Sequence, residues 1–116
     1  MHLTLQQLRL FEAVSRLGGY SLAANELCIT QPAVSIQIKR LEEQVGLPLF
    51  EKIGKKTFPT VAGKAMYSAS LDILNRINDL KISIDELKEV VKGVLQISVV
   101  TTAKYFLPHL LGVFLH

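Results

Sequence analysis

The sequence is poor in the residues that mark several protein classes. Its 116 residues include one cysteine, four prolines and no tryptophan. A single cysteine excludes a disulfide framework and a multi-cysteine zinc site, and it suits a reducing cytosol. The prolines, together with seven glycines, are too few for a collagen-like or linker-like chain. Because 49% of the residues are hydrophobic and the net charge is only +3, a disordered tail is excluded as well.

Secretion and membrane signals are also missing. The N-terminal residues lack both a basic region and a continuous apolar run, so we expect no signal peptide. The most apolar stretch, Val94 to Leu115, is interrupted by Gln96, Lys104 and Pro108. We therefore expect buried globular sequence there, no membrane span, and a cytoplasmic protein.

Residues for catalysis are scarce too. His2, His109 and His116 lie near the ends of the chain, and none has the spacing of a metal-binding pair. No glycine-rich phosphate loop is present. Cys28 is expected to be a small buried residue in a turn and not a nucleophile. The sequence therefore predicts neither an enzyme nor a metal site.

Apolar periodicity predicts helices from the start of the chain. Residues Leu5 to Leu17 place apolar side chains three and four positions apart, which is typical of one helix face. Gly18-Gly19 is expected to end this helix, because glycine accepts the left-handed conformation of helix ends. Ser21 is expected to cap a second, short helix over Leu22 to Leu27.

A third helix follows after a turn of about three residues. Thr30 is expected to cap it, Gln31-Pro32 to open it and Gly46 to end it. Its apolar stripe is Val34, Ile38, Leu41 and Val45. The second and third helices with their turn form a helix-turn-helix.

The opposite face of the third helix is the first candidate site. It carries Pro32, Ile36, Lys39 and Glu43, with Ser35 and Arg40 at its flanks. Its N-terminal half is small and polar and could reach base edges in a major groove, while Thr30 and the helix N-terminus could bind a phosphate. An ordinary solvated face explains the periodicity equally well. Ile36 shifts the balance towards DNA, because it could pack on a thymine methyl group; its alternative is packing on a neighbouring chain.

A basic hairpin is predicted over Leu47 to Pro59. Two short runs flank Gly54-Lys55, which is typical of a two-stranded hairpin. Its lysines, Lys52, Lys55 and Lys56, form a basic cluster with Lys64, which follows the hairpin, and no acidic residue lies between Glu51 and Asp72. They suit contacts with phosphates or a minor groove, and the alternative is a solvated basic turn.

A long helix is predicted from its cap, Thr60, to about Val91. Its apolar residues are Tyr67, Leu71, Leu74, Ile77, Leu80, Ile84, Leu87 and Val91. They recur about every 3.4 residues, close to the coiled-coil period of about 3.5. Such a helix is too long to hide its stripe against a small domain, so the stripe predicts a partner helix from a second copy of the chain.

Beyond Lys92-Gly93 the pattern changes. Val94 to Val100 is rich in β-branched residues and predicts a strand, and residues 101–116 predict the start of a helix. One strand and one helix are not a fold, so this segment is interpreted as the first piece of a second domain. The predicted organisation is therefore 1–59, 60–91 and 92–116.

Residues 3 to about 91 resemble LysR-type transcriptional regulators, and Gly93 to Phe114 resembles the first strand and helix of that family's effector domain. The specific matches are Ala23-Ala24, Leu27, Gln31-Pro32-Ala33-Val34-Ser35, Leu41-Glu42, Leu49-Phe50, Thr60, Ala62 and Gly63. The resemblance implies a mainly α fold: a winged helix-turn-helix, a long dimerisation helix and the start of an α/β effector domain. It also implies binding to interrupted palindromes in double-stranded DNA, as dimers or dimers of dimers. Full-length members respond to a small co-inducer, whereas residues 1–116 are expected to bind no cofactor.

The resemblance assigns roles by position. It implies that Gln31, Pro32, Ser35 and Ile36 face bases. It also implies that Thr30, Lys39 and Arg40 position the DNA backbone and that Lys55 and Lys56 lie on the wing. The chain departs from the family in two respects: Ile36 stands where the family often has arginine or another polar residue, and the wing carries Lys52, Lys55 and Lys56 where arginine is usual. Lysine lacks arginine's planar fork, so its contacts should be less base-specific.

These observations support one leading hypothesis and two rivals. The leading one is a dimeric, sequence-specific regulator. The segments Met1 to Leu8 and Phe50 to Lys56 most resemble the subgroup that controls Rubisco (carbon-dioxide-fixation) operons. The first rival is a helical dimer whose helix-turn-helix surface binds another protein. The second is a short family member that blocks full-length partners by forming mixed dimers.

Overall fold

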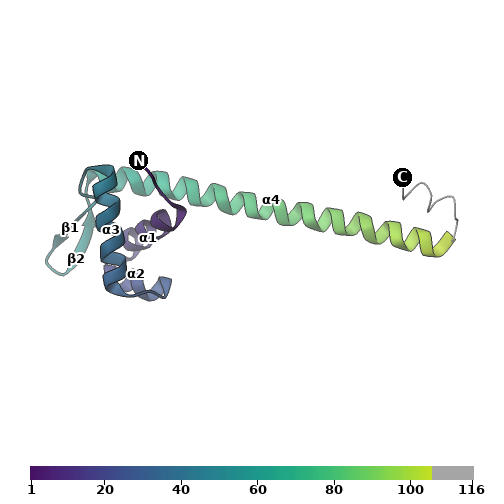
Figure 1. Cartoon of the computed structure of the whole chain (residues 1–116), viewed down its shortest axis with the longest axis horizontal. Coiled ribbons are helices and arrows are strands. Elements are labelled where there is room, and N and C mark those ends of the chain that lie inside the picture. Colours follow the sequence, from purple (N-terminus) through teal and green to yellow (C-terminus); the bar gives the residue numbers. More distant parts are fainter. Residues whose placement is uncertain (106–116) are drawn as a thin grey trace. The chain divides into compact units, whose positions relative to one another are not determined.

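The computed structural model describes residues 1–105, with side chains as far as residue 98. It is mainly helical, as predicted. The elements are α1 (Leu5–Leu17), α2 (Tyr20–Leu27), α3 (Gln31–Val45), β1 (Phe50–Ile53), β2 (Lys56–Pro59) and α4 (Val61–Tyr105) (Figure 1). The chain divides into two compact units, Met1–Ile77 and Asn78–His116. The first unit holds the helix-turn-helix, the hairpin and the start of α4.

Polar caps and left-handed residues set the ends of α1 and α3. Thr4 caps α1 in a reciprocal box with Gln7, and Thr30 caps α3 by accepting a 3.3 Å hydrogen bond from the Ala33 N–H. Gly18 and Gly46 end the two helices with φ of 74° and 84°. The predicted bounds of both helices and the predicted Thr30 cap are confirmed.

The start of α2 and its last turn differ from the prediction. The helix begins at Tyr20, two residues early, and its N-cap is Gly19, which makes no side-chain capping bond. Ser21 is therefore not a cap. Cys28 is exposed, so its predicted burial is wrong. Cys28 is the C-cap of α2 and adopts the left-handed conformation (φ 58°). Its place in the structure therefore follows from the turn that ends the helix and not from packing in the core.

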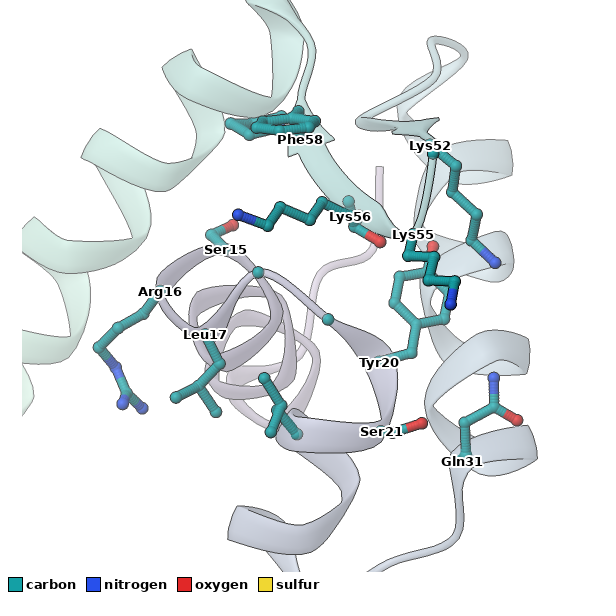
Figure 2. Close-up of a pocket in the computed structure, with 16 residues that line it drawn as sticks. Ser15, Arg16, Leu17, Tyr20, Ser21, Gln31, Lys52, Lys55, Lys56 and Phe58 are labelled. Atoms are coloured by element: carbon teal, nitrogen blue, oxygen red, sulfur yellow. The ribbon is translucent and has the colours of Figure 1, made fainter.

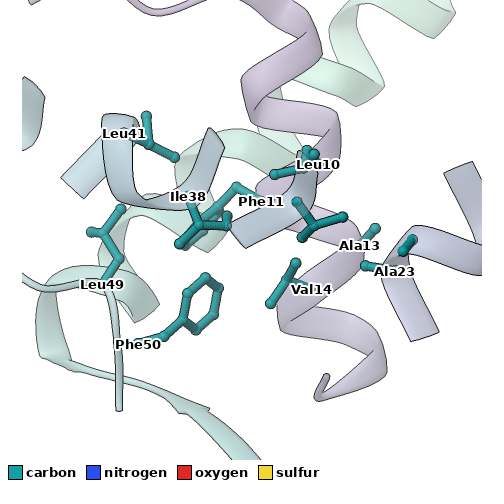
Figure 3. Close-up of a cluster of buried hydrophobic side chains, with 11 residues drawn as sticks. Leu10, Phe11, Ala13, Val14, Ala23, Ile38, Leu41, Leu49 and Phe50 are labelled. Atoms are coloured by element: carbon teal, nitrogen blue, oxygen red, sulfur yellow. The ribbon is translucent and has the colours of Figure 1, made fainter. Parts of the chain in front are cut away.

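One aliphatic and aromatic core holds the three short helices and the hairpin together (Figure 3). The largest fully buried apolar side chains are Phe11, Val14, Val34, Ile38, Leu41 and Leu49. Each contributes about 1.5–3 kcal/mol of transfer free energy. The three from α3 belong to the predicted stripe, so burial of that stripe fixes the rotation of α3 about its own axis.

The hairpin β1–β2, hereafter the wing, forms as predicted. The strands pair antiparallel from Phe50↔Pro59 to Ile53↔Lys56, and Gly54-Lys55 is the two-residue loop. Gly54 has φ 65°, the positive value that a type II′ turn requires at its first central position. The Thr57 N–H donates to the Gly18 carbonyl at 3.4 Å, which ties the wing to the turn between α1 and α2.

A close backbone approach joins the wing to the start of α4. The Thr60 hydroxyl donates to the Pro48 carbonyl at 2.7 Å and accepts from the Gly63 N–H at 3.1 Å, so the predicted Thr60 cap is confirmed. A Cβ at Gly63 would lie 2.1 Å from the Leu49 carbonyl oxygen. Only glycine fits there without displacing backbone. Leu49 is itself held by its N–H, which donates to the Glu42 carboxylate at 2.7 Å.

Helix α4 continues past the predicted end near Val91. It passes through Gly93 and runs to Tyr105, so the strand predicted over Val94–Val100 is not formed. A strand must pair its backbone groups with a neighbouring strand, whereas a helix satisfies them internally. Among residues 1–105 the only sheet is the two-stranded wing. The predicted second-domain helix reaches beyond residue 105 and so lies partly outside the described residues.

The first turns of α4 complete the core of the first unit. Ala62, Met66 and Tyr67 pack against the core, and Ser70 is fully buried. Tyr67 packs partly against the core of its own chain, and its role in dimerisation stays a prediction. Leu71, Leu74 and Ile77 are half-buried.

Candidate nucleic-acid interface

The buried stripe of α3 leaves the opposite face of the helix in solvent. Val34, Ile38 and Leu41 have no exposed surface. The residues predicted to face DNA lie away from them: Gln31, Pro32, Ile36, Lys39 and Arg40 are exposed and Ser35 is half-buried. Ile36 is 52% exposed, so about half of the surface of this β-branched side chain faces solvent.

The N-terminal turn of α3 has few free N–H donors, and its electrostatic character comes from the helix dipole. Thr30 satisfies the Ala33 N–H, and Pro32, which has no N–H, lies in the first turn. No acidic residue is present in that turn. The positive end of the helix dipole is therefore not neutralised by a neighbouring carboxylate.

A groove of about 820 Å³ lies beside this turn, between the wing and the α1–α2 turn (Figure 2). Its polar and charged lining comprises Ser15, Arg16, Tyr20, Ser21, Gln31, Lys52, Lys55, Lys56 and Thr57. No aspartate or glutamate is among the lining residues that the structure describes. The groove is therefore a concave, cationic surface shared by the end of α1, the start of α2, the start of α3 and the wing.

The groove brings some predicted residues together and leaves others apart. Gln31 and the three wing lysines line it, whereas Thr30, Pro32, Ser35, Ile36, Lys39 and Arg40 do not. The latter six belong to the cap and the outer face of α3. The candidate interface therefore has two adjoining parts, which share α3: a helix face and a basic groove.

Sequence reasoning missed the contribution of the α2 N-terminus. Tyr20 and Ser21 line the groove because α2 starts at Tyr20. The Lys52 Nζ lies over the Tyr20 ring, 5.1 Å from its centroid. Burial raises the pKa of the Tyr20 phenol, and the Glu42 charge raises it further. The Gly18-Gly19 pair marked a turn but gave no sign that an aromatic ring would follow it into the groove.

A surface ion-pair network braces α1 against α2. The Arg16 guanidinium contacts Glu12 at 2.8 Å and also pairs with Glu26 of α2. The bond from Arg16 holds the pKa of the Glu26 carboxyl below its ordinary value. Although Arg16 lines the groove, its guanidinium is thus already paired with two carboxylates. The i,i+4 spacing of Glu12 and Arg16 was a visible signal, whereas the bond to Glu26 depends on the packing of the two helices.

The second unit carries a separate apolar surface. Leu80 and Leu87 are each 59% exposed, and Ile84 and Val91 are exposed as well. A shallow depression of about 360 Å³ is lined by Ile84, Leu87, Lys88, Val91, Lys92 and Leu95. Because α4 stays helical beyond Gly93, Leu95 extends the predicted stripe by one further turn.

The described part of the chain carries neither a metal-binding cluster nor a helix fit to span a membrane. Residues 1–105 contain no cluster of three or more His, Cys, Asp or Glu side chains placed to hold a metal ion. None of the described helices combines the length and the hydropathy that a membrane span requires.

Comparison with known proteins identifies the family. The profile "Bacterial regulatory helix-turn-helix protein, lysR family" matches residues 5–64. A "RuBisCO operon transcriptional regulator" from Acidithiobacillus ferrooxidans is 47% identical over 113 residues, which are 97% of this chain and 37% of the relative. A protein of the same description from Allochromatium vinosum is 43% identical over 98% of this chain and 38% of its own length. The chain thus spans somewhat over a third of the length of these curated relatives.

The fold agrees with a solved DNA complex. The crystal structure described as "BenM_DBD/catB site 1 DNA Complex" matches with a TM-score of 0.68 and 30% identity, over 77% of this chain and 96% of that one. Profile, relatives and fold therefore agree, and the chain belongs to the lysR family of bacterial regulatory helix-turn-helix proteins.

Proposed function

We propose that this chain binds double-stranded DNA sequence-specifically as a homodimer, reads an interrupted palindrome and so regulates transcription. One observation carries the proposal: the exposed face of α3 and the cationic groove adjoin at Gln31. A major groove accommodates a helix, and the flanking phosphates need cations beside it.

Base recognition is assigned to the N-terminal half of α3. Gln31, Pro32, Ser35 and Ile36 would face base edges. The amide of Gln31 can make a bidentate pair with adenine, and Ile36 can pack on a thymine methyl group. Thr30, Lys39 and Arg40 would contact the backbone and fix the register of the helix.

The wing lysines would bind the backbone beside the recognised bases. Lys52, Lys55 and Lys56 are exposed and line one groove, which lacks acidic residues among the described lining. Each phosphate neutralised by a lysine releases counterions, so binding through these residues should weaken steeply as salt rises.

Dimerisation is assigned to the apolar stripe of α4. Leu80, Ile84, Leu87 and Val91 form exposed apolar surface at helical spacing in the second unit. A second copy of the same stripe would cover this surface by knobs-into-holes packing. Leu71, Leu74 and Ile77, at the end of the first unit, would extend the contact, and the exposed part of the partly buried Tyr67 would join it. A dimer presents two α3 helices, which is why the target should be a repeat.

The wider role follows from the relatives. Because the two relatives above are named regulators of the RuBisCO operon, we propose a carbon-fixation operon as the target and the cytoplasm, where such DNA lies, as the location. We assign DNA binding to residues 1–59 and dimerisation to 60–91, and we propose that 92–116 lead into an effector domain that binds a co-inducer.

Selection from a pool of random duplexes at near-physiological salt tests the proposal. We expect enrichment of an inverted repeat with a fixed spacer, since two linked α3 helices read two half-sites. If duplexes are retained but no sequence is enriched, the chain binds only the DNA backbone, and a helical dimer that binds another protein is favoured. Enrichment of a single half-site would contradict the dimer while leaving base recognition intact.

A further inference from the structure

The ring of Tyr20 is fixed by the aromatic core of the first unit. It lies edge-on to Phe50, with centroids 6.3 Å apart and planes at 73°. Phe50 in turn packs on Phe11, 5.0 Å away. Tyr20 is half-buried and is the first residue of α2, directly after the Gly18-Gly19 turn. Its orientation is therefore set by packing before any ligand arrives.

Lys52 reaches this ring from the wing. It lies two residues after Phe50 on β1, and so on the same side of the hairpin as that buried side chain. Its partner across the strands is Thr57, whose N–H is tied to the Gly18 carbonyl at 3.4 Å. The lysine stem therefore starts from an anchored position, and its ammonium ends 5.1 Å from the Tyr20 centroid. That separation is within the range of a cation–π contact.

The other wing lysines have no such support in the described structure. Figure 2 shows Lys52 and Lys55 on the side of the groove where Tyr20 and Gln31 lie, and Lys56 extending towards Ser15. Within the described residues, Lys52 is the wing lysine whose ammonium lies over an aromatic ring. Lysine is otherwise a flexible point charge, so a ring beneath it removes much of the freedom that binding would have to restrict.

We propose that Tyr20 is a positioning residue for DNA binding: its ring holds the Lys52 ammonium in the groove between the wing and α3, where a backbone phosphate meets a preoriented cation. The inference rests on the proposed function. It adds a residue of α2 to an interface otherwise built from α3 and the wing, and it gives Lys52 a role that Lys55 and Lys56 do not share.

A double-mutant cycle tests the coupling. The probe is the duplex recovered by the selection above, and its affinity is measured by fluorescence anisotropy from about 50 to 200 mM salt. We expect Tyr20→Leu to weaken binding about two- to fivefold when Lys52 is present, and to have little effect in a Lys52→Ala background. Tyr20→Phe keeps the ring face and is the matched control; it should bind like the unaltered protein. Lys52→Ala should lower the salt slope by about 0.9.

Equal losses from Tyr20→Leu with and without Lys52 would overturn the inference, because Tyr20 would then act through the fold alone. So would a Tyr20→Phe variant as weak as Tyr20→Leu. A second measurement does not depend on the variants folding. In the NMR spectrum of the unaltered protein, the ring current of Tyr20 should shift the Lys52 ε-CH₂ protons upfield, and an unshifted signal would refute the contact. Failure of the unaltered protein to bind any duplex would instead refute the proposed function.

Discussion

Replacement of Gly63 by alanine should destabilise the first unit. The added Cβ would lie 2.1 Å from the Leu49 carbonyl oxygen, 3.1 Å from its carbon and 3.2 Å from the Pro59 Cβ. The Leu49 carbonyl also accepts from the Thr60 N–H at 3.0 Å, so it cannot move without straining that bond. Overpacking costs about 1–3 kcal/mol and a strained hydrogen bond about 1 kcal/mol. Alanine's higher helix propensity returns up to about 1 kcal/mol, which leaves a net loss of roughly 1–3 kcal/mol.

The matched control is Gly93→Ala. Gly93 is also a helical glycine of α4, but an added Cβ there has no heavy atom within 4 Å. This variant should gain up to about 1 kcal/mol of local helix stability. Urea unfolding at fixed protein concentration, followed by circular dichroism, distinguishes the two. For an m-value of about 2 kcal/mol per M, Gly63→Ala should lower the midpoint by about 0.5–1.5 M. An unchanged or higher midpoint for Gly63→Ala would refute the claim that the Leu49 carbonyl excludes a side chain.

Three further changes have defined outcomes. Ser70 is fully buried and its hydroxyl has no hydrogen-bond partner, so Ser70→Ala should raise the unfolding free energy by about 1 kcal/mol; a loss of stability in urea unfolding would reveal a hidden partner. Leu80→Asp with Leu87→Asp changes two side chains that are 59% exposed, so it should yield folded monomers by analytical ultracentrifugation, and a persisting dimer would contradict the assignment of the stripe. Lys55→Ala with Lys56→Ala should weaken binding to all duplexes and reduce the salt slope by about 1.8; an unchanged slope would remove both lysines from the interface.

Local rules predicted the parts of the fold that depend on local chemistry. Thr30 capped α3, Gly46 ended it and Gly54 turned the wing, because each role is decided by a few neighbouring backbone groups. The register of the α3 stripe followed from spacing alone. These features define the exposed helix face, which is why most of the candidate DNA-binding residues could be named from the sequence.

The predictions were wrong where the structure depends on tertiary packing or on a partner strand that the described residues do not supply. Ser21 was a better local cap than Gly19, but the turn between α1 and α2 starts the helix earlier. The β-branched run after Gly93 predicted a strand, yet a strand needs a partner that the described residues do not supply. The contact between Tyr20 and Lys52 joins residues far apart in the sequence, so no spacing rule could have indicated it.

The anchoring of the wing at its base has a consequence for how such proteins diversify. Leu49, Thr60 and Gly63 lock the open end of the hairpin through backbone contacts, and Thr57 is tied to the α1–α2 turn. Insertions near the base would break these contacts, so we expect changes in length to be tolerated only at the Gly54-Lys55 loop. An inserted pair of residues on each strand would preserve the alternation of faces, whereas a single extra residue would invert it. Variation in the reach of the wing should therefore arise in symmetric steps at the tip, with the helix-turn-helix left unchanged.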